Sequence, residues 1–497
     1  MASTSRSGPP DVSGQAGIGG RRGLTLAACM MATFMAAVES TIVGTARPTI
    51  VAELGDFHLF SWVFAVYLLF QAVSIPIYGR LSDLYGRKRV FFAGAGVFLL
   101  GSTLCGFATN MFWLIAFRAL QGMGAGAVQP IAYAIVGDIY TPAERARVQG
   151  LLSSVFGLSA VVGPTLGAFL VEHASWSVVF WINLPIGALA MAMLAAFLRE
   201  RPHGHAARID YRASLLLMLG AGALMMAMIQ GTRLAPWLLG ACVAVGLVAL
   251  AALVRHERQA PAPMLPLRFW SNRVIALGNF GSFGIGMVMM SVTGFLPIYV
   301  QGVMERDAAA SGVVLAAMSI SWAVASIVAG RVMLSTSYRV SAMFGGAMLA
   351  LGSAMLVAMT PASGLVWAAA GALLVGLGMG SCNTTYLVSV QGAAALRERG
   401  AATASNMFMR IVGQSTGAAL FGALVNAGLG HQAAPPGDLA HASALAGALR
   451  GVYIVATMVG LIVLLLGSRL PRALNPASLP EPEVPRRGRS EVPDRER

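Results

Sequence analysis

The chain has 497 residues, of which 57% are hydrophobic and only 11% are charged, whereas roughly 25% of the residues in a soluble domain are charged. This composition excludes a water-soluble protein, because no soluble core could bury so much apolar surface. The formal net charge of +14 does not indicate nucleic-acid binding, because the basic residues lie in short gaps between apolar runs and form no basic domain.

Apolar runs long enough to cross a bilayer recur along the whole chain. They predict an all-α integral membrane protein with about fourteen transmembrane helices. In chain order, the predicted spans are residues 24–46, 60–79, 90–108, 112–137, 148–171, 178–198, 213–231, 236–254, 274–300, 311–334, 341–360, 364–390, 402–427 and 449–468.

The distribution of arginine predicts the orientation. If the N-terminus is cytoplasmic, the outer loops hold only Arg233, Arg306 and Arg450, and the inner segments hold most of the others. Basic loops stay on the cytoplasmic side, so we expect both termini inside and an even number of spans. Lys88 is the only lysine among 34 basic residues. That usage is typical of a GC-rich bacterial genome, which makes the bacterial inner membrane the expected location.

A weak internal repeat indicates the domain organisation. Gly79 and Arg80 end the second predicted span, and Gly330 and Arg331 end the tenth. Paired bundles are usual in secondary transporters. We therefore expect six-helix bundles at 23–200 and 261–470, related by pseudo-twofold symmetry, with two extra helices in a linker at 201–260. The tails, 1–22 and 471–497, have the composition of disordered segments.

Glu39 is the only acidic residue deep inside a predicted span. A carboxylate is costly there and by default marks an ion or substrate pathway. Burial favours its neutral form and a nearby arginine favours its charged form, so a site that changes surroundings can load and release a proton. Arg118 is the natural partner, because both residues lie roughly 10 Å from the outer ends of their spans. The alternative is a purely structural ion pair or helix clamp.

Asp83 and Arg87 lie just past the inner end of the second span. A carboxylate is unfavourable beside the C-terminus of its own helix, so we expect Asp83 to cap another helix or to pair with a cation. The alternative is a solvated turn whose charges only orient the chain. In the fifth span, Gly163 and Pro164 allow a bend and Gly167 permits close packing, or the helix is simply kinked.

Several polar residues inside the spans are candidates to line a substrate cavity. Arg410 lies roughly 12 Å into its span, which is too deep for a residue that only orients the chain. The others are equally well explained by hydrogen bonds between helices. The candidates are Tyr67, Gln71, Gln121, Asn279, Asn383, Arg410 and Gln414.

Short segments along the chain resemble the motifs of one family. The loop GRLSDLYGRKR (79–89) resembles the signature loop of the major facilitator superfamily. ESTIVGTARPTI (39–50) resembles the first-helix motif of its fourteen-helix drug:proton antiporter branch, RALQGMG (118–124) the fourth-helix motif, and GPTLG (163–167) the fifth-helix antiporter motif. WINLP (181–185), FLPIY (295–299) and RIVG (410–413) extend the resemblance over residues 24–468.

The resemblance implies efflux by alternating access, driven by a proton gradient and without a cofactor. It assigns Glu39 and Arg118 to proton coupling. It also implies a cytoplasmic latch between the halves and an interface in the fifth span that prevents leak. The latch residues are Gly79, Asp83, Gly86, Arg87 and Asp138, and the interface residues are Gly163, Pro164 and Gly167. Two positions depart from the family pattern, since Glu39 stands where Asp is frequent and Arg47 where the residue is usually apolar.

We expect a multidrug exporter of small lipophilic compounds that also interacts with protons and membrane lipid, and with neither nucleic acid nor metal. We expect a monomer, and a periplasmic adaptor is left open as a further partner. The excess of buried arginine favours a second hypothesis, export of an anionic or neutral metabolite. A membrane-embedded enzyme or sensor is a remote third, because no histidine lies in a predicted span and no soluble domain is apparent.

Overall fold

The computed structural model describes residues 13–55, 60–198, 200, 210–230, 234–260, 268–306, 308–395, 398–429 and 439–472, and every regular element in these ranges is a helix. They are α1 (Ser13–Thr45), α2 (Arg47–Leu54), α3 (Phe60–Tyr85), α4 (Arg87–Gly106), α5 (Met111–Ile139), α6 (Pro142–His173), α7 (Val178–Trp181), α8 (Asn183–Phe197), α9 (Tyr211–Gln230), α10 (Pro236–Gln259), α11 (Arg268–Ser271), α12 (Arg273–Thr293), α13 (Leu296–Gly302), α14 (Ala308–Ser335), α15 (Tyr338–Val357), η2 (Pro361–Ser363), α16 (Gly364–Ala393), α17 (Arg399–Leu429) and α18 (Leu439–Ser468).

The N-terminal tail is shorter than the predicted segment 1–22. Helix α1 begins at Ser13 and therefore extends beyond its apolar part. Pro10 is the last proline before it, and residues 13–45 contain no proline that would break the helix. Residues 1–12 and 473–497 lie outside the described residues. The predicted disorder of the C-terminal tail therefore falls almost entirely outside them.

Within the described residues, eleven helical segments are long and apolar enough to cross a membrane. Each coincides with a predicted span. The three remaining predicted spans also coincide with helices, α3, α6 and α9, which are not among the eleven. Of these, α9 contains a shorter apolar stretch, Arg212–Leu224. The protein is thus a multi-pass helical membrane protein.

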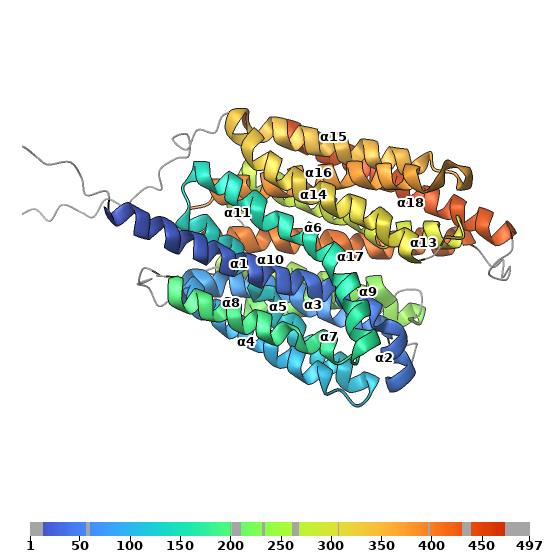
Figure 1. Ribbon diagram of the computed structural model, residues 1–497, viewed down its shortest axis with the longest axis horizontal. Helices are drawn as coiled ribbons and strands as arrows, with labels where there is room; N and C mark the ends of the chain where they lie inside the picture. Colours follow the sequence, from blue (N-terminus) through green and yellow to red (C-terminus); the bar gives the residue numbers. More distant parts are fainter. Residues whose placement is uncertain are drawn as a thin grey trace, which may run out of the picture.

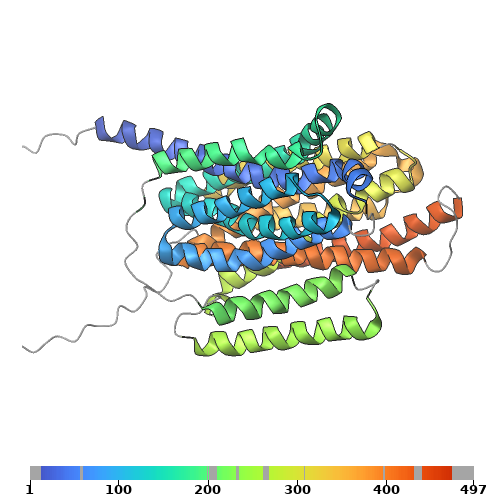
Figure 2. The same cartoon turned by 90° about the horizontal axis from the view of Figure 1, so that it is seen from below.

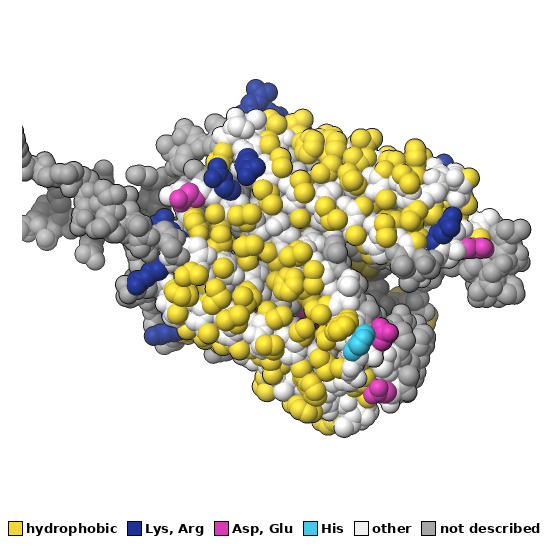
Figure 3. Space-filling view, viewed as in Figure 1, with side chains coloured by type: hydrophobic (Ala, Val, Ile, Leu, Met, Phe, Trp, Pro, Cys, Tyr) yellow, Lys and Arg dark blue, Asp and Glu magenta, His cyan; other side chains and the backbone are white. Residues whose placement is uncertain are grey.

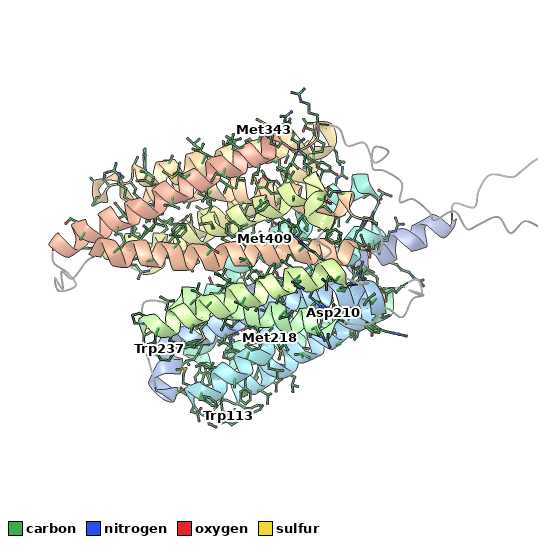
Figure 4. The ribbon with its side chains drawn as sticks, turned by 180° about the vertical axis from the view of Figure 1, so that it is seen from behind. Trp113, Asp210, Met218, Trp237, Met343 and Met409 are labelled. Atoms are coloured by element: carbon green, nitrogen blue, oxygen red, sulfur yellow. The ribbon has the colours of Figure 1, made fainter. Side chains whose placement is uncertain are left out.

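The surface of the bundle matches a lipid environment. A band of hydrophobic side chains covers its middle, and the basic side chains gather at the end where α1 begins (Figure 3). Two exposed tryptophans lie toward the other end: Trp237 is 74% exposed and Trp113 is 48% exposed, and both lie away from the end that holds Asp210 (Figure 4). Amphipathic aromatic rings favour the boundary between lipid and water.

The helices form two groups that follow the chain order. In Figure 1, the helices of the first half, α1 to α8, lie mainly below those of the second half, α12 to α18. Two large hydrophobic cores result, of which the first also includes Leu387 and Ala404 of the second half. Phe98 and Tyr133 belong to the first core, and Trp322 and Tyr386 belong to the second.

The halves meet mainly along two helix pairs, α6 with α14 and α3 with α17, which together form the seam. Small residues allow these helices to approach closely. A β-carbon at Gly150 on α6, for example, would collide with the Ser326 carbonyl of α14. The contacts between the halves therefore include backbone packed on backbone.

Helices α9 and α10 form a pair at the edge of the bundle (Figure 2). Helix α9 packs against both α3 and α17, so it spans the seam. His256 Nε2 at the end of α10 lies 2.6 Å from Asp210 Oδ2 at the start of α9. Burial raises the pKa of Asp210, but hydrogen bonds from the Ala213 backbone N–H and from His256 outweigh it and hold that pKa below its ordinary value.

Candidate functional site

Glu39 on α1 and Arg118 on α5 form an ion pair, and neither side chain has any exposed surface. The Arg118 Nε donates a hydrogen bond to the Val63 carbonyl over 3.1 Å, and the guanidinium lies 4.1 Å from the centroid of the Tyr67 ring. The two residues that the sequence places at similar depth are therefore in direct contact.

The second oxygen of the Glu39 carboxylate is held by Asn183 on α8. The Asn183 Nδ2 donates to Glu39 Oε2 over 2.5 Å and to Ser102 Oγ over 3.0 Å. Gln121 Oε1 accepts from Arg118 Nη1 over 2.8 Å, and Gln121 Nε2 donates to Ser102 Oγ over 3.0 Å. Both carboxylate oxygens thus have donors, all of them on helices of the first half.

Two polar atoms beside this carboxylate have no partner. Arg118 Nη2 and the Tyr67 hydroxyl are buried and make no hydrogen bond with the described residues. A buried donor without a partner is costly. The site can therefore accept a further ligand, such as a water molecule or a polar substrate group, without breaking the Glu39–Arg118 pair.

A close approach between α3 and α5 builds the site. A β-carbon at Gly122 would lie 2.5 Å from the Tyr67 carbonyl oxygen and 3.0 Å from its Cα, so only glycine fits there. Arg118 lies one helical turn before Gly122 on α5, so this packing also places the Tyr67 ring against the Arg118 guanidinium. Gln121, which is predicted to line a cavity, belongs to the hydrogen-bond network of Glu39 and Arg118.

At the end of the bundle where α1 begins, Asp83 on α3 caps a helix of the other half. Its carboxylate accepts hydrogen bonds from the backbone N–H groups of Gly400, over 3.1 Å, and Ala401, over 2.8 Å, at the start of α17. Negative charge is favourable at a helix N-terminus. Asp83 also forms an ion pair with Arg87. The sequence predicts that Asp83 caps another helix or pairs with a cation, and both contacts are present.

Arg87 connects this cap to α5. Its Nε donates to Asp138 Oδ2 over 3.0 Å, and its Nη1 donates to Ser82 Oγ over 2.8 Å. Arg399 on α17 lies 3.9 Å from the other Asp138 oxygen. We call Asp83, Arg87, Asp138 and Arg399 the charged latch. It joins α3, α4, α5 and α17, so it spans the two halves.

Two glycines shape the turn of the charged latch. Gly86 has a φ of +94°, which a residue with a side chain rarely adopts. Gly79 lies against α17, and a β-carbon there would lie 3.0 Å from the Gly400 carbonyl oxygen. Glu200, which the sequence did not single out, accepts from the backbone N–H groups of Arg87 and Lys88 at the start of α4.

A buried pair of glutamines also joins the two halves. The Gln149 Nε2 on α6 donates to Gln391 Oε1 on α16 over 2.9 Å. The Gln391 Nε2 donates to the Tyr133 carbonyl over 3.2 Å and to Thr403 Oγ1 over 3.1 Å. Both glutamines are fully buried. We call this set the glutamine bridge.

Arg410 on α17 is a further buried arginine, like Arg118 and Arg87. Its Nη1 donates to Asn383 Oδ1 over 3.3 Å, and its guanidinium lies 5.1 Å from the centroid of the Phe156 ring on α6. The Phe156 ring stacks on Trp322 of α14, with centroids 5.7 Å apart. Arg410 forms no ion pair with a carboxylate of the described residues. Unlike Arg118, it is a buried cation without a counter-charge.

The remaining predicted cavity residues have different surroundings. Asn279 donates to Ser405 Oγ over 2.8 Å and thus joins α12 to α17, as expected for a hydrogen bond between helices. The Gln414 Nε2 lies 3.0 Å from the Met289 sulfur, also between α17 and α12. Gln71 is buried on α3. The polar candidates therefore do not form one cluster.

The family of the protein is shown by a match over most of the chain. Residues 29–418 match the model of the Major Facilitator Superfamily. The chain belongs to the major facilitator superfamily. It is a transporter and not an enzyme.

Relatives within this superfamily carry names that refer to drugs and efflux. The chain is 34% identical to Multidrug resistance protein 3 of Bacillus subtilis over 397 residues, which are 79% of this chain and 77% of that protein. It is 32% identical to the multidrug transporter protein MdtP of the same organism, over 83% and 76% of the two chains. It is 30% identical to the efflux pump FUS6 of Gibberella fujikuroi, over 84% and 77%.

A solved structure supports the major facilitator fold. The human organic anion transporter MFSD10 (TETRAN) superimposes with a TM-score of 0.65 and covers 90% of this chain and 99% of its own. Its sequence is 15% identical, so the likeness concerns the fold alone.

The fifth-span motif of this major facilitator protein lies in an unbroken helix. Helix α6 runs from Pro142 to His173 and includes Gly163, Pro164 and Gly167. Gly163 and Gly167 are buried, and the side chain of Pro164 lies outside the described part. Helix α6 contacts α1 on one side and α14 on the other. The motif thus lies on a helix of the seam.

Sequence reasoning missed Asn183, Gln149 and Gln391. Asn183 offered a signal, because it is a polar residue inside an apolar run and belongs to the segment WINLP. The two glutamines are 242 residues apart, and nothing local distinguishes them from glutamines that face a neighbouring helix.

Proposed function

We propose that this transporter exports small lipophilic compounds in exchange for protons. The observation that carries the proposal is the fully buried Glu39 carboxylate, paired with Arg118 and held by Asn183. Buried ionisable groups in membrane proteins mark ion pathways by default. The multidrug and efflux names of the relatives support the export direction and the substrate class.

Glu39 is the proton carrier in this proposal. When Glu39 is charged, Arg118 neutralises it and the pair is stable in the apolar interior. When Glu39 binds a proton, the guanidinium loses its counter-charge and is left buried, which is unfavourable. A change of conformation that exposes the site to the other side relieves this cost. Proton uptake and conformational change are thereby coupled.

Alternating access requires contacts that form on one side and break on the other. The charged latch and the glutamine bridge are such contacts, since each joins the two halves at or near the end where α1 begins. In the proposed cycle, both are intact while that end is closed and break when it opens. Helix α6 keeps the path closed through its packing on α1 and α14.

We propose that α3, α6 and α9 also cross the membrane and bring the number of spans to about fourteen, as in the drug:proton antiporter branch. Both termini are then cytoplasmic, because the arginine-rich end is the inner one. The location is the inner membrane of a bacterium. The protein acts as a monomer, with a periplasmic adaptor as an optional partner.

The test is transport in proteoliposomes that contain the full chain, with a fluorescent lipophilic cation as the probe. An imposed pH gradient should drive transport by the unaltered protein. Glu39→Gln should reduce this gradient-driven transport at least tenfold, because an amide cannot exchange a proton. The matched control is Glu172→Gln, which neutralises an exposed carboxylate on α6. Full gradient-driven transport by Glu39→Gln would reject the proposal.

A second candidate is export of an anionic metabolite, and Arg410 favours it. A buried guanidinium without a carboxylate partner, placed over the Phe156 ring at the seam, is suited to bind an anion. Competition assays separate the two candidates. Inhibition by aromatic carboxylates that disappears in Arg410→Gln supports anion transport, and inhibition by lipophilic cations alone supports the first candidate.

A further inference from the structure

A group of three arginines lies away from the sites described above. A cavity of about 380 Å³ is lined by Arg273, Arg339 and Arg469, together with Ser468. These arginines come from the start of α12, the start of α15 and the residue after α18. Three helix ends of the second half therefore meet around one cavity, which we call the arginine pocket.

Among the described residues, the arginines of this pocket have no counter-charge. Their side chains form no ion pair and no hydrogen bond with any residue that the structure describes. Arg273 and Arg469 are exposed, and Arg339 is partly buried. A second cavity of about 490 Å³ shares Arg339 and adds Arg472. Several guanidinium groups near one another repel, and an anion bound among them would offset that repulsion.

Apolar side chains continue from the pocket along the membrane-facing surface. On α15, Val340 is 48% exposed and Phe344 is 49% exposed. On the neighbouring helix α18, Leu465 is 65% exposed and Ile462 is 53% exposed. Met343 lines the second cavity. It lies on α15, near the end of the bundle where several side chains that end in nitrogen project outward (Figure 4). The ligand therefore meets a polar cationic end and an apolar track that leads toward the bilayer.

We infer that the arginine pocket binds the headgroup of an anionic phospholipid, with the phosphodiester among the arginines and the acyl chains along α15 and α18. Basic pockets between transmembrane helices are suited to anionic headgroups. A soluble phosphate shares the headgroup chemistry, but it would leave the apolar track unused. The inference is independent of the substrate and of the proton carrier.

The experiment is native mass spectrometry of the purified full chain after exchange into equimolar phosphatidylglycerol and phosphatidylcholine. We expect preferential retention of phosphatidylglycerol. Arg339→Gln combined with Arg469→Gln should weaken that binding about thirtyfold, since each arginine near an anionic surface contributes about a fivefold factor. The matched control is Arg89→Gln combined with Arg331→Gln, two exposed arginines that do not line the pocket.

Each outcome decides for or against the inference. Preferential retention that the pocket variant loses and the control keeps supports it. Equal retention of the two lipids by the unaltered protein overturns it, as does unchanged retention by the pocket variant. A parallel titration with inorganic phosphate distinguishes the two anion sources. Displacement of the lipid by millimolar phosphate would assign the pocket to a soluble anion and overturn the lipid assignment.

Discussion

Two buried ion pairs in this protein contain the same chemical groups but connect different parts of it. Glu39 and Arg118 lie within the first half, and all their hydrogen-bond partners are on helices of that half. Asp83 and Arg87 also form a pair, but the Asp83 carboxylate is shared with the backbone of α17 in the second half. The first pair can keep its partners when the halves move, and the second cannot.

This difference separates two tasks. A group that carries a proton through the proposed cycle can keep the same neighbouring residues in both end states. A group that reports which end is closed must exchange its partners. The location of the partners, rather than the chemistry of the pair, distinguishes the proposed proton carrier from the charged latch.

The largest effect is expected from Arg118→Ala. It leaves a buried carboxylate without its counter-charge, which costs about 3–5 kcal/mol of stability. The penalty should shrink as the pH falls, because protonated Glu39 needs no counter-charge. Denaturant unfolding in detergent measures both effects, with Arg89→Ala as the exposed control. An equal loss of stability in the two variants would show that the pair is not the cause.

Asp83→Asn should have a smaller effect on stability, about 1 kcal/mol, because the amide still fits but removes negative charge from the N-terminus of α17. Its effect on conformation should be larger. The labelling experiment uses a cysteine at the buried Thr403, with the native cysteines replaced by alanine. This cysteine should react with a soluble maleimide several-fold faster when Asp83→Asn is present than when Asp83 is retained. Glu144→Gln, an exposed change nearby, should leave the labelling rate unchanged, and an unchanged rate in Asp83→Asn would contradict the proposed latch.

The glutamine bridge tests whether contact between the halves requires charge. Gln391→Leu removes one of the two acceptors of the Gln149 Nε2, which keeps the Tyr133 carbonyl, and should cost about 1 kcal/mol. Replacing both glutamines by leucine should cost less than the sum of the single changes. A double-mutant cycle by thermal unfolding measures the coupling. Additive single changes would show that the two amides act independently.

The smallest effect concerns an exposed cap at the start of α6. Hydrogen bonds from the Thr141 backbone N–H and hydroxyl hold the pKa of Glu144 below its ordinary value. The stability that they contribute is present above the unfolded pKa and is lost as the pH falls through the lower, folded pKa. Thr141→Ala should cost about 1 kcal/mol at neutral pH and less in acid. A cost that does not vary with pH would exclude Glu144 from the effect.

The sequence predicts the helices well because each apolar run can be recognised from consecutive residues alone. It also indicates Glu39 and Arg118 separately, since a charge inside an apolar run is conspicuous. Their contact could not be derived, because it depends on how α1 and α5 are rotated about their axes. Asp83 was expected to cap some helix, but the choice of α17, more than 300 residues away, follows only from packing. The extension of α1 to Ser13 was missed because helices continue beyond their apolar parts.

The position of α9 has a consequence for any motion of the two bundles. This helix touches α3 and α17 at once, and these helices belong to bodies that must separate if the arginine-rich end opens. A rigid rod cannot follow two bodies that move apart. Helix α9 must therefore slide along one of them, and α10, tied to it through His256 and Asp210, must travel with it. If the bundles move in this way, lipid beside the pair is displaced, and the rate of opening then depends on the thickness and fluidity of the membrane.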